Sequence, residues 1–448
     1  MFDVMRNMWA LFLGMLLLMV GNALQGSLIG VRAASEPSFT TEIFGYVSAA
    51  YFAGFLGGSQ VTPYLLRRVG HVRVFAALAS LVSAAFIIYA AIVDPWVWFV
   101  LRFIVGFCFS GIYIVSESWI NDGSSNENRG TALSTYMFFQ MFGIVVGQQL
   151  LNVGDPEGYE LFVLISVLVS ISFAPILLSV SPAPLYETAR PMTLRQLLDA
   201  SPLGSVGSFL LGAVFSAMFG MGAIYAGRSG LSVAEISIFL TVMYGGAMLT
   251  QVPLGWLSDR MDRRQLIVLV ALSGGIACVW AATSGTTVLG TLYGFDIYVI
   301  YPAAAVLGGL ANPLYGLLIA HTNDFLEHDQ MASASGGIVF FNGVGAMGGP
   351  VIVGYLMESQ IGNAGFWIFI AAMMGFIGAY GIFRMTQRPT IDVADTSPFQ
   401  VVTPRLTPVA AEISQEVVIE QMEEAAQDDD DEDNQSDKSE DAPFVADR

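Results

Sequence analysis

Charged residues are scarce in this chain, and so are cysteine and histidine. Only 12% of its 448 residues are charged, whereas a soluble globular domain carries about 25%. There are two cysteines, Cys108 and Cys278, and three histidines, none of them clustered along the sequence. A disulfide framework and a metal site are therefore not expected. The chain also lacks a phosphate-binding loop, an HExxH motif and a CxxC motif, so we expect neither an enzyme nor a cofactor.

Apolar residues, in contrast, are abundant. Hydrophobic residues make up 54% of the chain and the mean hydropathy is +0.63. A helix needs about 20 consecutive apolar residues to cross a hydrocarbon core about 30 Å thick. Twelve runs qualify, and they cover residues 9–31, 43–63, 72–93, 95–120, 130–153, 159–180, 204–226, 233–256, 265–285, 297–320, 331–356 and 363–384. We predict an all-α membrane protein with twelve transmembrane helices, the first of them longer than the apolar part of a signal peptide and therefore retained.

Arginines in the short loops predict the orientation, because basic residues near helix ends stay on the cytoplasmic side. If the N-terminus is cytoplasmic, the outside loops contain only Arg32 and Arg228. The inside segments then contain Arg6, Arg67, Arg68, Arg73, Arg129, Arg190, Arg195, Arg260, Arg263, Arg264, Arg384 and Arg388. We therefore expect both termini to be cytoplasmic.

An internal repeat appears at an offset of 202 residues. The matching pairs are Asp94 and Asp296, Gly106 and Gly308, Tyr113 and Tyr315, Asn121 and Asn323, Asp122 and Asp324, Gly143 and Gly345, and Gly147 and Gly349. Folds of this size often arise by such duplication. We predict two pseudo-symmetric six-helix bundles, residues 1–180 and 204–388, joined by a proline-rich cytoplasmic linker over 181–203 with at most one surface helix.

The acidic residues gather at the C-terminal end. The chain carries a net charge of −19, and residues 391–448 hold 17 acidic and 3 basic residues, a net of −14. This segment includes the run DDDDED at 428–433 and has few aromatic residues. Such a composition predicts a disordered cytoplasmic tail over 389–448. The tail either stays solvated, docks a partner or binds divalent cations.

In the stretch GWLSDRMDRR at 255–264, five charged residues follow directly after an apolar run. It resembles the G-x-x-x-D-R-x-G-R-R loop of the major facilitator superfamily through Gly255, Asp259, Arg260, Arg263 and Arg264. Asp262 stands where glycine is usual. The resemblance implies a gating loop, in which Asp259 accepts hydrogen bonds from a neighbouring arginine or a helix N-terminus and latches one alternating-access state. The alternative is a plain anchor of basic residues on the cytoplasmic side.

The equivalent turn of the first half, residues 63–73, is degenerate. Pro63 stands at the glycine position and Arg67 at the aspartate position, and only Arg68 and Gly70 are kept. An arginine cannot accept the hydrogen bonds that the latch requires. We therefore expect a one-sided latch.

Further elements strengthen the resemblance. Arg102 to Gly106 is similar to the R-x-x-x-G element of the superfamily's fourth helix, and ESWIND at 117–122 is followed by NRG at 128–130. With residues 67–75, these segments resemble a poorly characterised bacterial branch typified by the YcaD transporter. The resemblance covers residues 1 to about 388. It implies a transporter fold in a bacterial inner membrane but no substrate.

Four residues of these elements are candidates for coupling or gating: Arg102, Glu117, Asn121 and Arg129. An arginine within the membrane normally faces a cavity or a partner, although Arg102 is close enough to the helix start to extend to the outer interface instead. Glu117 is the best candidate for proton coupling. It could equally pair with Arg129, or with the loop at 255–264, as part of a gate.

Polar residues in the middle of predicted helices are candidates for a substrate cavity near the bilayer midplane. They are Asn22, Gln25, Tyr136, Gln140, Tyr244 and Asn342. Asn22 and Gln25 share a helix face, and Asn342 is the repeat partner of Gln140. Hydrogen bonding between helices is the competing explanation for these residues. The aromatic and sulfur-containing side chains of Met218, Phe219, Met221 and Tyr244 would suit an apolar or amphipathic ligand.

These patterns favour a secondary-active transporter of a small organic solute, a metabolite or an amphipathic drug-like compound. The rival hypothesis is a non-transporting receptor or scaffold on the same fold, with the acidic tail as its docking element. An open polar cavity between the halves would favour transport, and a cavity filled by bulky side chains would favour the rival. The expected partners are the solute and the lipid bilayer, not nucleic acid, and a monomer suffices.

Overall fold

The computed structural model describes residues 2–124, 126–175, 192–292, 295–387, 396–399, 401–402 and 407–422. Helices dominate, and each of the twelve predicted runs coincides with one. The first set comprises α1 (Phe2–Ser35), α2 (Thr41–Val69), α3 (His71–Ala91), α4 (Pro95–Gly123), α5 (Asn126–Gln149), the short η1 (Leu150–Asn152) and α6 (Glu160–Ser172). The second set comprises α8 (Leu194–Ala200), α9 (Pro202–Arg228), α10 (Val233–Ser258), α11 (Arg263–Ser284), α12 (Ile300–Asn323), α13 (His328–Glu358) and α14 (Ala364–Met385).

Local sequence determines where several of these helices begin. Asp94 caps α4 by accepting hydrogen bonds from the backbone of Trp96 and Val97, and Pro95 occupies the first helical position, where its missing N–H has no cost. Ser232 and Glu235 form a capping box at the start of α10, which satisfies two otherwise unpaired donors. The helix starts are therefore specified by residues outside the apolar runs.

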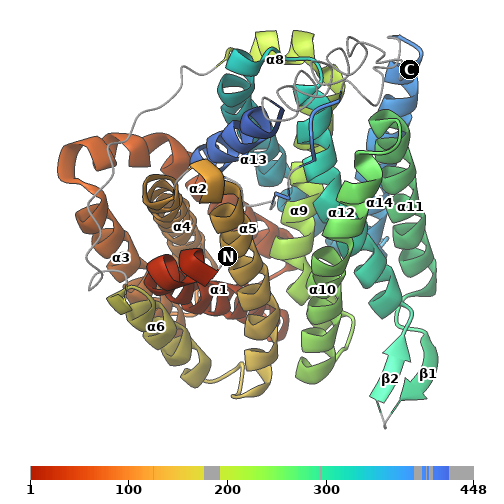
Figure 1. The fold of residues 1–448 in the computed structure, drawn as a ribbon. Helices are drawn as coiled ribbons and strands as arrows, with labels where there is room; N and C mark the ends of the chain where they lie inside the picture. The colour runs from red at the N-terminus through yellow and green to blue at the C-terminus, as the bar shows by residue number, and fades with distance from the viewer. Residues whose placement is uncertain are drawn as a thin grey trace, which may run out of the picture.

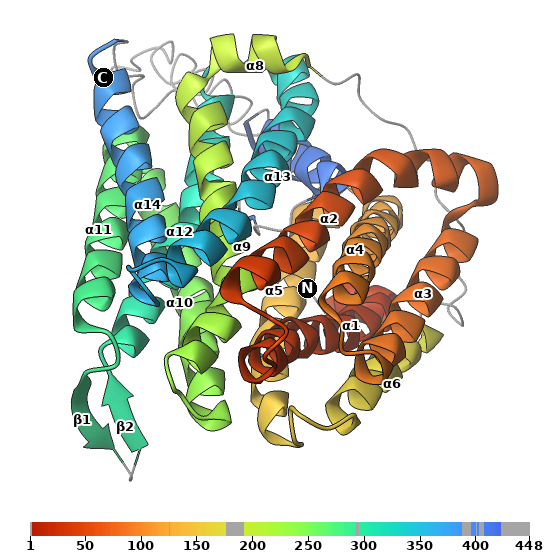
Figure 2. The same ribbon diagram turned by 180° about the vertical axis from the view of Figure 1, so that it is seen from behind.

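Ten of the described helices are long and apolar enough to span a membrane. Of the other two predicted spans, α2 is long but less apolar, and α6 has only 13 described residues before the chain leaves the described range at 176. The molecule is thus an all-α, multi-pass membrane protein, as predicted. Figures 1 and 2 show α1–α6 packed together on one side and α9–α14 on the other.

The two groups of helices pack by the same scheme. α2 lies against α4 as α10 lies against α12, and α1 lies against α5 as α9 lies against α13. Gly106 of α4 faces the carbonyl oxygen of Tyr51, and its repeat partner Gly308 of α12 faces that of Met243. A side chain at either glycine would collide with that backbone, so the matching glycines mark helix crossings. The repeat in the sequence is therefore a repeat in packing.

The helix ends define two faces of the molecule. The α8 face carries α8, the α2–α3 turn and the α10–α11 loop (259–262). The hairpin face carries β1 (Val288–Leu292) and β2 (Phe295–Tyr298), which pair antiparallel between α11 and α12. This two-stranded hairpin was not predicted, since the segment between the helices is too short to carry a clear alternating pattern. Figure 1 shows the hairpin at the opposite end from α8.

Two predicted boundaries change. In the predicted linker, α8 is the surface helix that was allowed for, and α9 begins at Pro202 rather than 204; residues 181–191 lie outside the described range. The predicted disorder of 389–448 is wrong for 396–399, 401–402 and 407–422, and residues 408–422 form a helix. This stretch is apolar and helix-favouring, and the acidic residues that dominate the tail's average follow it. The DDDDED run lies outside the described residues.

Candidate functional site

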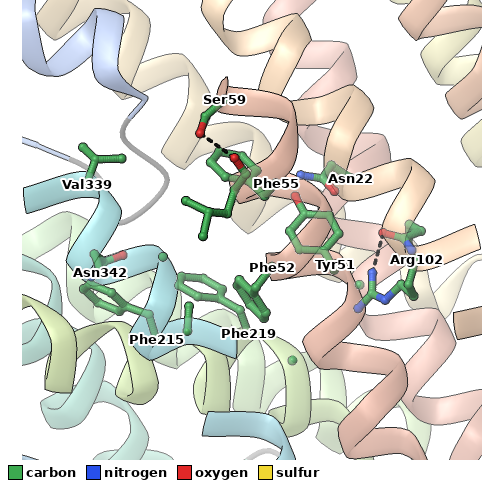
Figure 3. A pocket seen from close by; sticks show the side chains of 16 residues that line it. Asn22, Tyr51, Phe52, Phe55, Ser59, Arg102, Phe215, Phe219, Val339 and Asn342 are labelled. Carbon is green, nitrogen blue, oxygen red and sulfur yellow. Dashed lines mark hydrogen bonds between the residues drawn. The ribbon is translucent and has the colours of Figure 1, made fainter. Parts of the chain in front are cut away.

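A cavity lies between the two groups of helices, with a volume of about 830 Å³ including the part that opens to solvent. Its walls come from α1, α2 and α4 of the first group and from α9 and α13 of the second. Figure 3 shows polar side chains among aromatic ones. The polar lining residues are Asn22, Gln25, Ser59, Arg102 and Asn342, and the aromatic ones are Tyr51, Phe52, Phe55, Phe215 and Phe219.

Arg102 is the cationic member of this lining. It is 4% exposed, its Nη1 donates to Oε1 of Gln25 at 3.2 Å, and its guanidinium lies 5.2 Å from the ring centroid of Tyr51. The pairing with Gln25 and Tyr51 turns Arg102 inward (Figure 3). The alternative that Arg102 extends to the outer interface is therefore wrong. A guanidinium fixed in this way presents a charge to the cavity.

Amides line both sides of the cavity. On α1, Asn22 donates to the hydroxyl of Tyr113 at 3.1 Å, and that hydroxyl in turn donates to the sulfur of Met19. On α13, Asn342 donates to the backbone carbonyl of Ser208 at 3.2 Å. These bonds fix the orientation of each amide. The two candidate roles of these amides, helix bridging and cavity lining, are thus combined.

The remaining cavity candidates lie elsewhere. Tyr244 stacks on Phe219 at 5.1 Å between ring centroids, so it forms a second layer behind the wall. Tyr136 and Gln140 of α5 are buried but not part of the lining, and the same holds for Met218 and Met221. The position of a residue along its helix indicates its depth in the membrane but not the direction of its side chain. The sequence therefore could not separate the residues that line the cavity from those in the layer behind it.

Glu117 lies fifteen residues after Arg102 on α4, about 22 Å further toward the α8 face at 1.5 Å per residue. It is 2% exposed; the hydroxyl of Tyr136 donates to it at 3.3 Å, and the hydroxyl of Thr407 also donates to it. Arg129, the other proposed partner of Glu117, contacts Glu416 of the tail at 2.7 Å. Asn121, one turn beyond Glu117, is half-buried.

The hairpin side of the cavity is sealed by direct bonds between the two groups of helices. The seal includes an interaction of the Thr41 hydroxyl with Glu358 at 2.7 Å and a bond from Arg228 to the carbonyl of Phe39 at 2.6 Å. Further bonds join Tyr46 to Tyr355, Ser48 to Gly220, Ser237 to Gln148, and Gln149 to Thr241. The structure is therefore closed on the hairpin side.

The α10–α11 loop is held from inside its own group of helices. Arg263 donates from Nη1 to both carboxylate oxygens of Asp324, at 2.6 and 2.7 Å, and from Nη2 to the carbonyl of Ser397 at 2.6 Å. The side chains of Arg263 and Asp324 are 2% and 3% exposed. Burial raises the pKa of Asp324, and the Arg263 guanidinium opposes that rise. The pair is completed by a segment of the tail.

The other loop residues also contact the tail or cap a helix. Asp259 accepts from the backbone N–H of Phe399 at 3.0 Å, and its nearest arginine atom, on Arg263, is 3.7 Å away. Gly255 packs directly against the ring of Phe399. Asp262 caps α11 by accepting from the backbone of Arg264 at 2.9 Å, which gives the departure from glycine a structural reason. Asp259 thus lies at ion-pair distance from an arginine, as expected, and in addition accepts a hydrogen bond from the tail backbone.

The other loop arginines differ in environment. Arg260 is exposed and lies over the ring of Trp256 at 4.3 Å, whereas Arg264 is 5% exposed. In the α2–α3 turn, Arg68 is exposed and Gly70 adopts a φ of +84°, a conformation that favours glycine. Only the second turn thus carries buried charge.

Sequence reasoning missed the lining residues of α2 and the tail residues on the loop. Aromatic residues such as Tyr51, Phe52 and Phe55 are common in any membrane helix and do not by themselves indicate a cavity. Among the lining residues of α2, Ser59 alone has a small polar side chain. Thr407 and Pro408 do form a helix-start pattern, with threonine as N-cap and proline at the first position. That pattern could have revealed the helix at 408–422. Among the described residues, no group of three His, Cys, Asp or Glu could hold a metal.

Comparison with known proteins agrees with this geometry. The chain is 27% identical over 379 residues to an uncharacterized MFS-type transporter YcaD of Salmonella paratyphi A, covering 83% of this chain and 94% of that one. The fold is shared with many solved structures. The nucleoside transporter NupG matches with a TM-score of 0.68 at 15% identity, covering 84% of this chain and 98% of NupG. A bacterial homolog of the lysosomal transporter Spinster matches at 0.63 and 13%, covering 92% and 98%.

The family-level match extends across nearly all of the described chain. The sequence matches the Major Facilitator Superfamily over residues 11–301 and again over 205–410. The overlap of the two matches lies in the second group of helices, as expected for a duplicated fold. With the YcaD relatives, the paired packing of the helices and the cavity between them, this match shows that the chain belongs to the Major Facilitator Superfamily.

Proposed function

We propose that this protein is a secondary-active transporter that moves a small organic solute by alternating access. The observation that carries the proposal is the cavity, lined by aromatic and a few polar side chains, between two groups of helices that are bonded together on the hairpin side. A midplane site shared by two repeats is what this mechanism requires. In this account residues 1–180 rock against 204–388, and a monomer is sufficient.

The cavity chemistry points to a class of solute. Tyr51, Phe55 and Phe215 offer flat apolar surface, while Arg102 offers a cation at one end. A ligand that uses both has an apolar or aromatic part and a hydrogen-bond acceptor or anionic group. We propose an amphipathic metabolite or drug-like compound of this kind as the substrate.

The arginine distribution orients the protein. The α8 face carries Arg68, Arg260 and Arg264, so we assign it to the cytoplasmic side of a bacterial inner membrane, with both termini cytoplasmic. The hairpin face is then external. With its external side sealed, the structure corresponds to an inward-facing state.

Glu117 remains the candidate for proton coupling. It is a buried carboxyl that lies between the cavity and the cytoplasmic side and is bonded to Tyr136. If it carries the coupled proton, Glu117→Gln should abolish the dependence of transport on a pH gradient. An unchanged dependence in that variant would assign Glu117 to gating alone.

The rival scaffold hypothesis has weaker support. A scaffold has no need for a polar cavity, and here Arg102, Gln25 and Asn342 line one without filling it. The part of the tail described by the structure is bound within the molecule and is therefore not presented as a free docking element. Transport is the hypothesis that accounts for both the cavity and the bound tail.

A ligand screen tests the proposal. Because a ligand that binds the folded state raises its stability, amphipathic anions and acceptor-rich metabolites should be screened for a rise in melting temperature in detergent. Arg102→Gln and Asn342→Ala should lose the rise. Gln140→Ala is the matched control, since Gln140 is the repeat partner of Asn342 but lies outside the lining. A rise that Gln140→Ala abolishes and Asn342→Ala keeps would place the site elsewhere.

A further inference from the structure

The tail helix, residues 408–422, is buried on nearly all sides. Thr407 caps it by accepting from the backbone N–H of Ala410 at 3.4 Å. The buried side chains are Val409, Ala410, Ala411, Ile413, Ser414, Gln415, Val417 and Val418; they cover most of the helix circumference, and the half-buried Glu412, Glu416 and Glu420 form an acidic stripe along the remaining side. A helix whose buried residues reach round most of its surface is largely enclosed by protein. Figures 1 and 2 show it in dark blue between the two groups of helices.

The tail helix is bonded to the first group of helices. Thr407 donates to Glu117 of α4, and Glu416 accepts from Arg129 of α5 at 2.7 Å. The side chain of Val417 packs against Gly130, 3.1 Å from where a Cβ would stand. An apolar contact, a hydrogen bond and an ion pair therefore act together on this side.

The same segment is also bonded to the second group. Gln415 accepts from Asn323 of α12 at 2.7 Å, and the carbonyl of Val402 accepts from Gln251 of α10 at 2.8 Å. The preceding residues, Ser397 and Phe399, bind the α10–α11 loop. The tail therefore bridges both groups at the α8 face.

We propose that residues 407–422 form an autoinhibitory plug, which fills the cytoplasmic mouth between the two groups of helices and holds them in the inward-facing state. This proposal rests on alternating access as the proposed function. To open on the hairpin face, the groups must approach each other at the α8 face, and an enclosed helix occupies that space. The plug must therefore leave before the transporter can complete a cycle.

The contacts indicate how the plug works. It takes Glu117, the candidate coupling residue, into a hydrogen bond with Thr407 and so covers it from the cytoplasm. It is tethered at a second place, because Arg263 and Asp259 bind the tail backbone before the helix begins. Release of the helix therefore need not free residues 396–402, and rebinding stays intramolecular.

Docking is tested first, without any substrate. In a Cys108→Ser, Cys278→Ser background, Asn323→Cys and Gln415→Cys place thiols where the 2.7 Å bond now lies. Oxidation should link them, so that cleavage at a protease site placed within 388–395 leaves the tail attached. Gln421→Cys with Asn323→Cys is the matched control, about 9 Å further along the helix at 1.5 Å per residue. Equal linking of both pairs, or of neither, overturns the docking.

Locking is tested by access from the hairpin face. Ser48 is fully buried and donates to the carbonyl of Gly220 across the seal at 3.0 Å. Ser48→Cys in the same background should react slowly with an impermeant maleimide added outside. Ile413→Asp, which puts an unpaired charge on a buried position, or a chain ending at Val402, should raise that rate several-fold. Gln421→Asp, at an exposed position, should leave it unchanged.

The outcomes separate the plug from the proposed function. If the tail links to α12 but neither Ile413→Asp nor the shortened chain speeds labelling, the tail is docked but locks nothing, and the plug is overturned. If labelling rises as predicted but no solute ever binds, the plug stands and the transport proposal fails. A chain ending at Met422 should behave as the full chain, since it keeps the whole plug.

Discussion

The α2–α3 turn and the α10–α11 loop occupy equivalent places in the two repeats, yet they differ in almost every contact. In the first turn, Arg68 is exposed and the chain passes through a glycine with positive φ. In the second, Arg263 is buried in an ion pair with Asp324 and bonded to the tail. The two repeats thus share their helix crossings but not the contacts of these two loops. The loop that retained the acidic and basic residues is the one that holds the tail.

The largest difference should appear when buried charge is removed. Arg263→Ala leaves Asp324 buried without its partner, and breaking such a pair costs about 3–5 kcal/mol. Arg68→Ala in the equivalent turn is a surface change and should stay within about 0.5 kcal/mol. Melting curves in detergent compare the two. Equal shifts would show that the Arg263 pair does not stabilise the fold.

The crossings should be equally sensitive in both repeats. Gly54 faces the carbonyl oxygen of Phe103, and Gly246 faces that of Ala305. Alanine at either position overpacks the crossing and should cost about 1–3 kcal/mol. Gly245 has no atom near its Cβ position, so Gly245→Ala should be neutral or gain up to about 1 kcal/mol from helix propensity. If Gly245→Ala and Gly246→Ala lower the melting temperature equally, the close helix crossing is not the cause of the loss.

The departure at Asp262 predicts a smaller effect. Asp262→Ala removes the N-cap of α11 and should cost about 0.5–2 kcal/mol, while Asp262→Gly, the usual residue of this loop, should cost only a few tenths. Thermal denaturation of the two variants measures the difference. If glycine were as harmful as alanine, the carboxylate would act through more than the cap.

The smallest effect concerns pH. Burial raises the pKa of Glu416, Arg129 opposes the rise, and Glu420 adds to it. A raised pKa means that the docked tail binds a proton more tightly than the released tail, so docking strengthens at low pH and weakens as pH rises through the shifted value. Spin-label distances between the tail and α12 should show more docked tail at mildly acidic pH. Glu416→Gln should flatten this dependence, and an opposite slope would contradict the sign.

The sequence predicted the membrane architecture well and the tail poorly. Long apolar runs are specified by the bilayer itself, so each predicted run coincides with a described helix, and ten of these helices are long and apolar enough to span a membrane. A polar group inside a membrane is costly unless it has a partner or faces a cavity. That cost identified Asn22, Gln25, Arg102 and Asn342 as candidates. Tyr51 and Phe55 were missed because aromatic residues in an apolar helix carry no such signal. The tail helix was missed because the acidic average of 391–448 concealed the short apolar stretch ahead of the acidic run.

The most direct test of alternating access under control of the tail is a pair of distance measurements. Spin labels on Tyr46→Cys and Tyr355→Cys report on the hairpin face, and labels on Arg68→Cys and Arg260→Cys report on the α8 face. In the full chain we expect a short distance across the hairpin face and a long one across the α8 face. A chain ending at Val402 should gain a second population with both distances reversed. Identical distributions in the two chains would contradict the account and favour a rigid scaffold.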